Sequence, residues 1–213
     1  MTLISRHGAR WARGGALGLL LVAAALLSAC QKSAGPGTRS SAFHGVDITG
    51  ASYAQGFDLP DSEGHERRLS DFKGKVVVVF FGYTQCPDVC PTTMTELAQA
   101  KRLLGPLGQQ VQGIFITVDP ERDTADLLTR YVHAFDPSFI ALRADAQRTR
   151  ATAESFHVFY EKVPGDRPGS YTIDHTAGSF VFDRQGRVRL FMRFGMGPKA
   201  WADDLGTLIK DAN

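Results

Sequence analysis

Cysteine is scarce in this chain: Cys30, Cys86 and Cys90 are the only three among 213 residues. Three cysteines are too few for the disulfide framework of a small secreted domain, so each one needs its own explanation. The chain also has little net charge. The formal net charge is +2, and residues 1–29 hold three arginines and no acid, which leaves the rest of the chain at −1. Because binding to phosphates needs a concentrated basic surface, we expect no nucleic-acid partner.

The remaining composition is that of an ordinary globular protein. Hydrophobic residues make up 43%, charged residues 22% and aromatic residues 10% of the chain. These values argue against intrinsic disorder and against a collagen-like fibre, and no internal repeat is visible. The length predicts one folded domain with an extension.

Residues 1–29 have the pattern of an export signal. Three arginines lie within the first 13 residues, and Ala16–Ala29 is a run of about 14 apolar or small residues. Such a run is too short for a hydrocarbon core of ~30 Å but fits the apolar region of a signal peptide. Its end, Leu27-Ser28-Ala29-Cys30, resembles the bacterial lipoprotein signal, in which the cysteine is lipidated and becomes the new N-terminus.

This resemblance predicts a lipid anchor at Cys30 that holds the protein to the bacterial membrane with its domain on the periplasmic side. An ordinary cleaved signal with an unrelated cysteine is the alternative. Residues 30–52 are rich in Gly, Ser, Thr and Ala and show no periodicity. We interpret them as a flexible tether with a reach of roughly 25 Å, followed by a folded domain over residues 53–213.

The folded part is predicted to alternate strands and helices. Val76–Phe81 is a continuous β-branched and aromatic run, typical of a central strand buried on both faces. We expect a second such strand over 111–118, strands over 179–182 and 188–194, and helices over 92–104, 124–135, 146–156 and 198–210. The pattern predicts an α/β domain with a central sheet and helices on both faces. We expect Asp123 to cap the second helix and Val163–Ser170 to be an irregular loop.

The cysteine pair Cys86 and Cys90 lies between a buried strand and the start of a helix. This is the carboxyl end of a strand, where open α/β sheets place their sites, and the helix dipole there favours thiolates over thiols. We therefore expect both thiols to be more acidic than a free cysteine. A structural disulfide across so short a loop would add little stability, and a structural zinc site would need two more ligands nearby. Acidic thiolates suit soft-metal binding or disulfide exchange.

The segment around this pair resembles the signature of the Sco/SenC family, thioredoxin-like copper proteins of respiratory-oxidase assembly. It reads Gly-Tyr-Thr-Gln-Cys-Pro-Asp-Val-Cys-Pro-Thr-Thr over residues 82–93. Residues 118–124 and 174–183 resemble two further blocks of the family, and the likeness extends from Tyr53 to Asp211. The resemblance implies a thioredoxin-like fold and copper, as Cu(I) or Cu(II), bound by Cys86, Cys90 and His175.

The residue types agree with this implication, because sulfur favours Cu(I) and an imidazole helps to hold Cu(II). Our leading hypothesis is a copper chaperone that helps to metallate the dinuclear copper site of a cytochrome c oxidase subunit, directly or through another periplasmic copper carrier. The alternative is a thiol–disulfide oxidoreductase that reduces the metal-site cysteines of the oxidase. In that case Cys86 would attack and Cys90 would resolve. Three residues between the cysteines, instead of two, argue against a general reductase.

Overall fold

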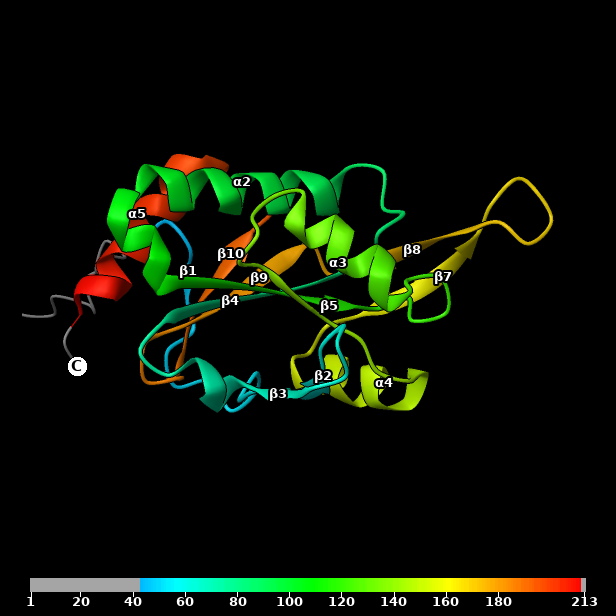
Figure 1. Cartoon of the computed structure of the whole chain (residues 1–213), viewed down its shortest axis with the longest axis horizontal. Helices are drawn as coiled ribbons and strands as arrows, with labels where there is room; N and C mark the ends of the chain where they lie inside the picture. Colours follow the sequence, from blue (N-terminus) through cyan, green and yellow to red (C-terminus); the bar gives the residue numbers. More distant parts are fainter. Residues whose placement is uncertain (1–42, 212–213) are drawn as a thin grey trace, which may run out of the picture. The chain divides into compact units, whose positions relative to one another are not determined.

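The computed structural model describes residues 43–211. A six-stranded sheet runs through this part of the chain in the order β1-β10-β9-β4-β5-β6 (Figure 1). Strands β4, β5 and β6 are parallel to one another, whereas β9 is antiparallel to β4, and β10 and β1 continue in antiparallel pairing. The sheet is therefore mixed. Its strands are β1 (Val46–Asp47), β4 (Val76–Gly82), β5 (Val111–Thr117), β6 (Ile140–Leu142), β9 (Gly178–Phe182) and β10 (Val188–Arg193).

Strands β4 and β5 form the centre of the sheet, and every residue of both is buried. Burial on both faces explains why their sequences are uninterrupted apolar runs instead of alternating ones. The two strands pair in register from Val76 opposite Val111 to Gly82 opposite Thr117. Their carboxyl ends therefore meet at one edge of the sheet.

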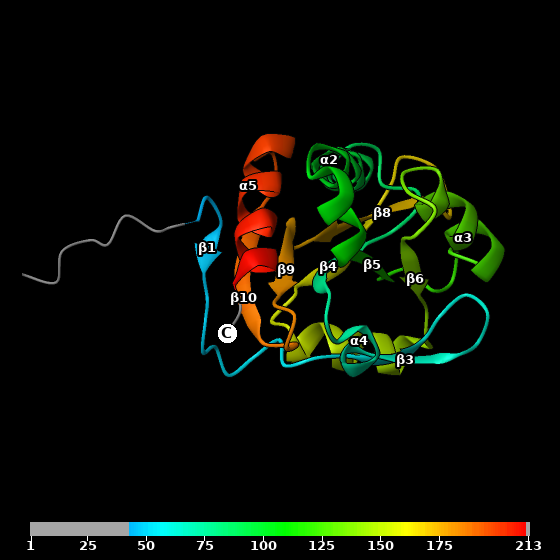
Figure 2. The same ribbon diagram turned by 60° about the vertical axis from the view of Figure 1, so that its left-hand side comes forward.

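Helices cover both faces of the sheet, as the sequence predicts (Figure 2). On one face lie α2 (Val89–Leu103), α3 (Ala125–His133) and α5 (Gly197–Lys210). The other face is covered by α4 (Ala146–Ser155) and a small antiparallel pair, β2 (Asp58–Pro60) and β3 (Glu66–Arg68). Two 3-10 helices connect these elements, η2 (Leu69–Phe72) and η3 (Gly105–Gln110).

The folded part begins earlier in the chain than the sequence predicts. Val46 and Asp47 pair with Phe191 and Leu190 of β10, and the backbone N–H of Gly45 donates to the carboxylate of Asp204 at 2.7 Å. The predicted boundary at Tyr53 is therefore wrong by about ten residues, because the start of the domain is held by partners late in the chain. The predicted signal peptide and the tether up to residue 42 lie outside the described residues.

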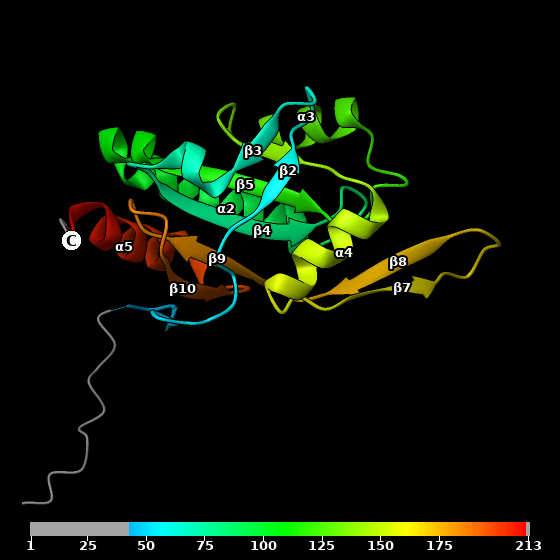
Figure 3. The same ribbon diagram turned by 90° about the horizontal axis from the view of Figure 1, so that it is seen from below.

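The loop expected at residues 163–170 is shorter in the structure and connects the two strands of a β-hairpin. Strands β7 (Tyr160–Pro164) and β8 (Tyr171–His175) pair antiparallel over all five positions, with Tyr160 opposite His175. Only residues 165–170 form the connection, which Gly165 closes by donating its N–H to the carbonyl of Ser170 at 2.9 Å. Figure 3 shows the hairpin extending past the ends of β4 and β9. His175 is thus held on a strand.

Candidate metal centre

Cys86 and Cys90 lie where β4 leads into α2. Cys90 is fully buried in the first turn of the helix, while Cys86 precedes the helix and is half-buried. Both are free thiols, and the backbone N–H of Cys90 donates to Cys86 Sγ at 3.4 Å. Gly82 makes room for this arrangement, because a Cβ atom at that position would lie 2.8 Å from Cys90 Sγ.

The two thiols differ in acidity. A hydrogen bond from the Cys90 thiol lowers the pKa of Cys86 to about 3, against the opposing effect of burial and with help from His175 and the backbone N–H groups of Asp88 and Cys90. The same hydrogen bond, together with burial, raises the pKa of Cys90. The pair therefore shares one proton, with the thiolate on Cys86. The prediction of two acidic thiols holds for Cys86 and is wrong for Cys90.

His175 reaches the cysteine pair from the end of β8. Its Nε2 lies 3.4 Å from Cys90 Sγ, and its Nδ1 lies 3.2 Å from the carbonyl oxygen of Thr176. Because a carbonyl oxygen can only accept, Nδ1 is the donor in this hydrogen bond, and Nε2 is the ring nitrogen that faces the sulfur. The ring meets Phe80 and Tyr83 edge-on, with centroid separations of 5.8 and 6.0 Å.

The structure thus brings together the three residues that the sequence singled out. The two sulfur atoms and one ring nitrogen all lie within 4.8 Å of one another. Beside them is a cavity of about 330 Å³, lined by Cys86, the Pro87–Val89 turn and Thr172–His175 among others. Two sulfurs and one imidazole form a donor set that suits a soft metal ion such as copper.

Asp123 supports the cysteine turn in a way that sequence reasoning missed. Its buried carboxylate accepts from the backbone N–H and the hydroxyl of Thr84, at 3.2 and 2.6 Å, and from the hydroxyl of Thr117 at 2.6 Å. Burial raises its pKa. The expected role as helix cap belongs to Thr124, whose side chain accepts from the N–H of Leu127. Asp123 instead fixes the chain just before Cys86.

A second polar network anchors the strand that carries His175. Arg122 pairs with the buried carboxylate of Asp119, donates to the carbonyl of Tyr171 at 2.8 Å and lies 3.6 Å above the Tyr171 ring. The Tyr171 hydroxyl donates back to Asp119 at 2.8 Å. Nearer the site, the Tyr83 hydroxyl accepts from the N–H of Ile173 at 3.2 Å. These contacts tie β8 to the ends of β4 and β5.

The predicted lipidation site cannot be placed in this geometry, since Cys30 lies outside the described residues. Among residues 43–211, no helix combines the length and the apolar character needed to cross a membrane.

A mixed sheet with a dithiol after its central strand and a facing histidine defines a thioredoxin-like protein with a soft-metal or redox centre. Comparison with protein families agrees with this class and identifies the family within it. The SCO1/SenC family model matches residues 46–210, which is most of the chain, so the protein belongs to the SCO1/SenC family.

Relatives in other organisms match the same region. The SCO2-like protein of Rickettsia felis is 32% identical over 144 residues, which cover 67% of this chain and 70% of that protein. The mitochondrial SCO2 homolog of Bos taurus is 38% identical over 139 residues, 64% of this chain. The match spans 52% of the bovine protein, about half its length.

Solved structures confirm the thioredoxin-like fold. ScoI of Bradyrhizobium japonicum, determined with copper bound, is 38% identical with a TM-score of 0.65, covering 72% of this chain and 97% of that one. Apo Sco1 of Thermus thermophilus is 40% identical with a TM-score of 0.69, covering 78% and 96%. BsSco, described as a member of the Sco family of cytochrome c oxidase assembly proteins, shares the fold at 18% identity and a TM-score of 0.58, covering 78% and 98%.

Proposed function

We propose that this protein is a copper chaperone that binds Cu(I) or Cu(II) through Cys86, Cys90 and His175. The observation that carries the proposal is the convergence of two sulfurs and one ring nitrogen within 4.8 Å at the end of β4. The donor types match the preference of copper, and the bound copper in the ScoI structure of Bradyrhizobium japonicum supports the choice of metal.

The acceptor in this proposal is the dinuclear copper site of a cytochrome c oxidase subunit, and another periplasmic copper carrier can stand between the two. The description of BsSco as an oxidase assembly protein supports this acceptor. Copper is cargo here, and transfer proceeds by ligand exchange. A cysteine or histidine of the acceptor enters through the cavity beside Cys86 and replaces one donor at a time, so no free ion is released.

The proposal includes a membrane attachment. Removal of residues 1–29 and lipidation of Cys30 would leave the domain on the periplasmic side, at the end of a tether up to residue 42. Such a tether lets an anchored chaperone reach an acceptor that is itself held in the membrane.

The two thiols differ in exposure and in acidity, and this difference supports a second function. Cys86 is the more exposed sulfur and has a pKa of about 3, while the buried Cys90 keeps its proton. This is the arrangement of an attacking and a resolving cysteine. The Cys86 thiolate would attack a disulfide of the oxidase to give a mixed disulfide. The Cys90 sulfur, after losing its proton, would then attack Cys86, leaving a Cys86–Cys90 disulfide and two reduced acceptor thiols.

Replacing His175 by Ala separates the two functions. Both sulfurs remain, so the Cys86–Cys90 disulfide of the variant should still form and be reduced. Its affinity for Cu(II) should fall by more than the roughly 10–100-fold typical of losing a group that only supports a ligand. Titration with Cu(I) and Cu(II), each against a competing chelator, measures this loss. The matched control is His133→Ala, an exposed histidine at the end of α3, which should bind copper like the wild type.

Two results would contradict the chaperone proposal. One is wild-type affinity of His175→Ala for both oxidation states of copper. The other is full oxidase assembly in cells that carry this variant, which would favour the reductase.

A further inference from the structure

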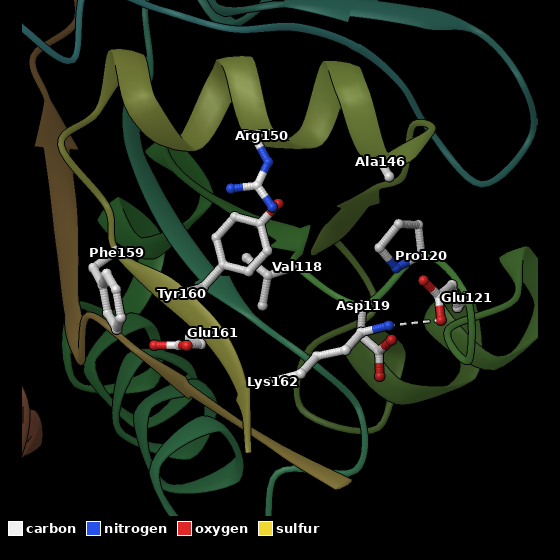
Figure 4. A pocket seen from close by; sticks show the side chains of 10 residues that line it. All are labelled: Val118, Asp119, Pro120, Glu121, Ala146, Arg150, Phe159, Tyr160, Glu161 and Lys162. Atoms are coloured by element: carbon white, nitrogen blue, oxygen red, sulfur yellow. Dashed lines mark hydrogen bonds and ion pairs between the residues drawn. The ribbon is translucent and has the colours of Figure 1, made fainter. Parts of the chain in front are cut away.

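A second and larger cavity lies away from the cysteine pair, between α4, β7 and the turn that follows β5 (Figure 4). Its volume is about 660 Å³, within the range of roughly 300–1,000 Å³ that ligand sites occupy. Val118, Pro120, Ala146 and Phe159 supply apolar surface, and the side chain of Phe159 stays 60% exposed. An apolar hollow bordered by an exposed aromatic ring is the kind of surface that receives a side chain of a partner.

The strand beside this cavity has an open edge. In an antiparallel ladder, hydrogen-bonded and non-hydrogen-bonded pairs alternate along the strands. Gly165 bonds to Ser170 at one end of the hairpin, and Thr176 donates to Phe159 at the other. The odd-numbered residues of β7 therefore direct their N–H and C=O groups toward β8. Tyr160 and Lys162 direct their N–H and C=O groups to the opposite edge, where no strand of the described residues pairs with β7.

The cavity also holds a positive charge that lacks a partner. Arg150 of α4 lies over the Tyr160 ring at 5.6 Å, and no carboxylate within residues 43–211 pairs with it. The other lysine or arginine at the cavity, Lys162, is already paired with Glu121 at 2.7 Å. In Figure 4 the Arg150 side chain extends from α4 toward Tyr160, with the Lys162 and Glu121 side chains farther along the cavity. Because Arg150 is exposed, it can pair with a carboxylate from outside the domain.

We infer that this groove binds an extended peptide segment of a partner protein, which adds as a third strand to the edge of β7. The segment would place an apolar side chain in the cavity and a carboxylate against Arg150. Main-chain hydrogen bonds to Tyr160 and Lys162 would supply affinity, and the cavity and Arg150 would supply specificity. The inference does not depend on copper binding, because none of these groups belongs to the dithiol–imidazole cluster.

The open edge gives the experiment a distinctive readout. The probes are N-acetylated, C-amidated heptapeptides of alternating valine and threonine, with one glutamate placed at each position in turn. They are added to the full chain in detergent micelles, and amide hydrogen exchange is followed residue by residue. Binding should slow exchange at Tyr160 and Lys162, whose amides face the open edge, and leave Glu161 and Val163 unchanged, since the ladder already protects them.

Variants and control peptides test each part of the inference. Arg150→Ala should weaken binding of the best peptide about fivefold, the effect of one exposed ion pair, whereas Arg102→Ala on α2 should leave it unchanged. Lysine in place of glutamate should weaken binding at least as much, and N-methylation of alternate peptide bonds should abolish it. His175→Ala should bind the peptide normally, which separates this site from the proposed copper site.

Three outcomes would overturn the inference. In the first, no peptide of the set slows exchange at Tyr160 and Lys162 at millimolar concentration. In the second, the glutamate and lysine peptides bind equally well. In the third, these two amides become protected without peptide as the protein concentration rises, which would make a second copy of the chain the occupant.

Discussion

Replacing Gly82 by Ala tests whether the end of β4 sets the position of the buried sulfur. An added Cβ would lie 2.8 Å from Cys90 Sγ, 2.9 Å from a ring carbon of Phe80 and 3.0 Å from one of Phe115. Ordinary contacts begin at 3.4 Å, so the sulfur or the new methyl group must move by 0.6 Å. All three neighbours are buried in the core, and the sulfur is the nearest of them, so its displacement gives the most direct relief of the clash.

The expected effect has two parts. Overpacking a core typically costs about 1–3 kcal/mol, which corresponds to a lowering of Tm by roughly 2–12 °C for a domain of this size. A donor displaced by about half an ångström leaves the geometry that the site requires, and copper affinity should fall by about 10-fold or more. Thermal unfolding measures the first part, and Cu(I) and Cu(II) titration of the full chain measures the second.

Gly113→Ala is the matched control for this experiment. Gly113 lies on β5 opposite Val78, and a Cβ there would lie 2.5 Å from the ring of Phe139, far from either cysteine in the sheet register. This variant should lose comparable stability and keep wild-type copper affinity. Equal losses of copper affinity in the two variants would refute the reasoning, because the effect would then follow from destabilisation alone.

Two further predictions concern the support of the site and its anchor. Burial raises the pKa of Asp123, so its carboxyl loses the proton at a lower pH in the unfolded chain than in the folded protein. The free energy of unfolding should therefore fall as the pH rises from 3.8 through the raised pKa. Asp123→Asn should lack this decrease when the free energy of unfolding is measured in urea from about pH 4 to 7. The same pH dependence in the variant and the wild type would contradict the prediction. Cys30→Ser should release the protein from the membrane without changing copper affinity, as fractionation and titration would show. Mass spectrometry that finds an unmodified Cys30 in the membrane-extracted wild type would argue against lipidation.

The sequence predicts those parts of the fold that have local causes. The apolar run Val76–Phe81 favours a buried strand, and the helix formers after Pro91 favour a helix that follows it. The cysteine pair at their junction is predictable for the same reason. His175 was found through the family resemblance, because the pairing of β7 with β8 that positions it spans segments with no helical or strand periodicity of their own.

The parts that sequence reasoning missed depend on partners distant in the chain. Val46–Asp47 is too short to show any periodicity, and the carboxylate of Asp204 that holds the neighbouring backbone lies 159 residues from Gly45. Asp123 has the residue type and position of a helix cap, and only the proximity of Thr84, 39 residues earlier, gives it another role. The open edge of β7 likewise became visible only when its ladder was known.

The three donors of the proposed copper site differ in how firmly they are held. Cys90 is buried between β4 and α2, and the backbone just before Cys86 is held by the hydrogen bond from Thr84 to Asp123. His175 enters from a hairpin whose other strand has an open edge, with Tyr160 directly opposite it. The pairing of β7 with β8 therefore positions the nitrogen donor, whereas the sulfurs depend on β4, α2 and the hydrogen bonds of Asp123.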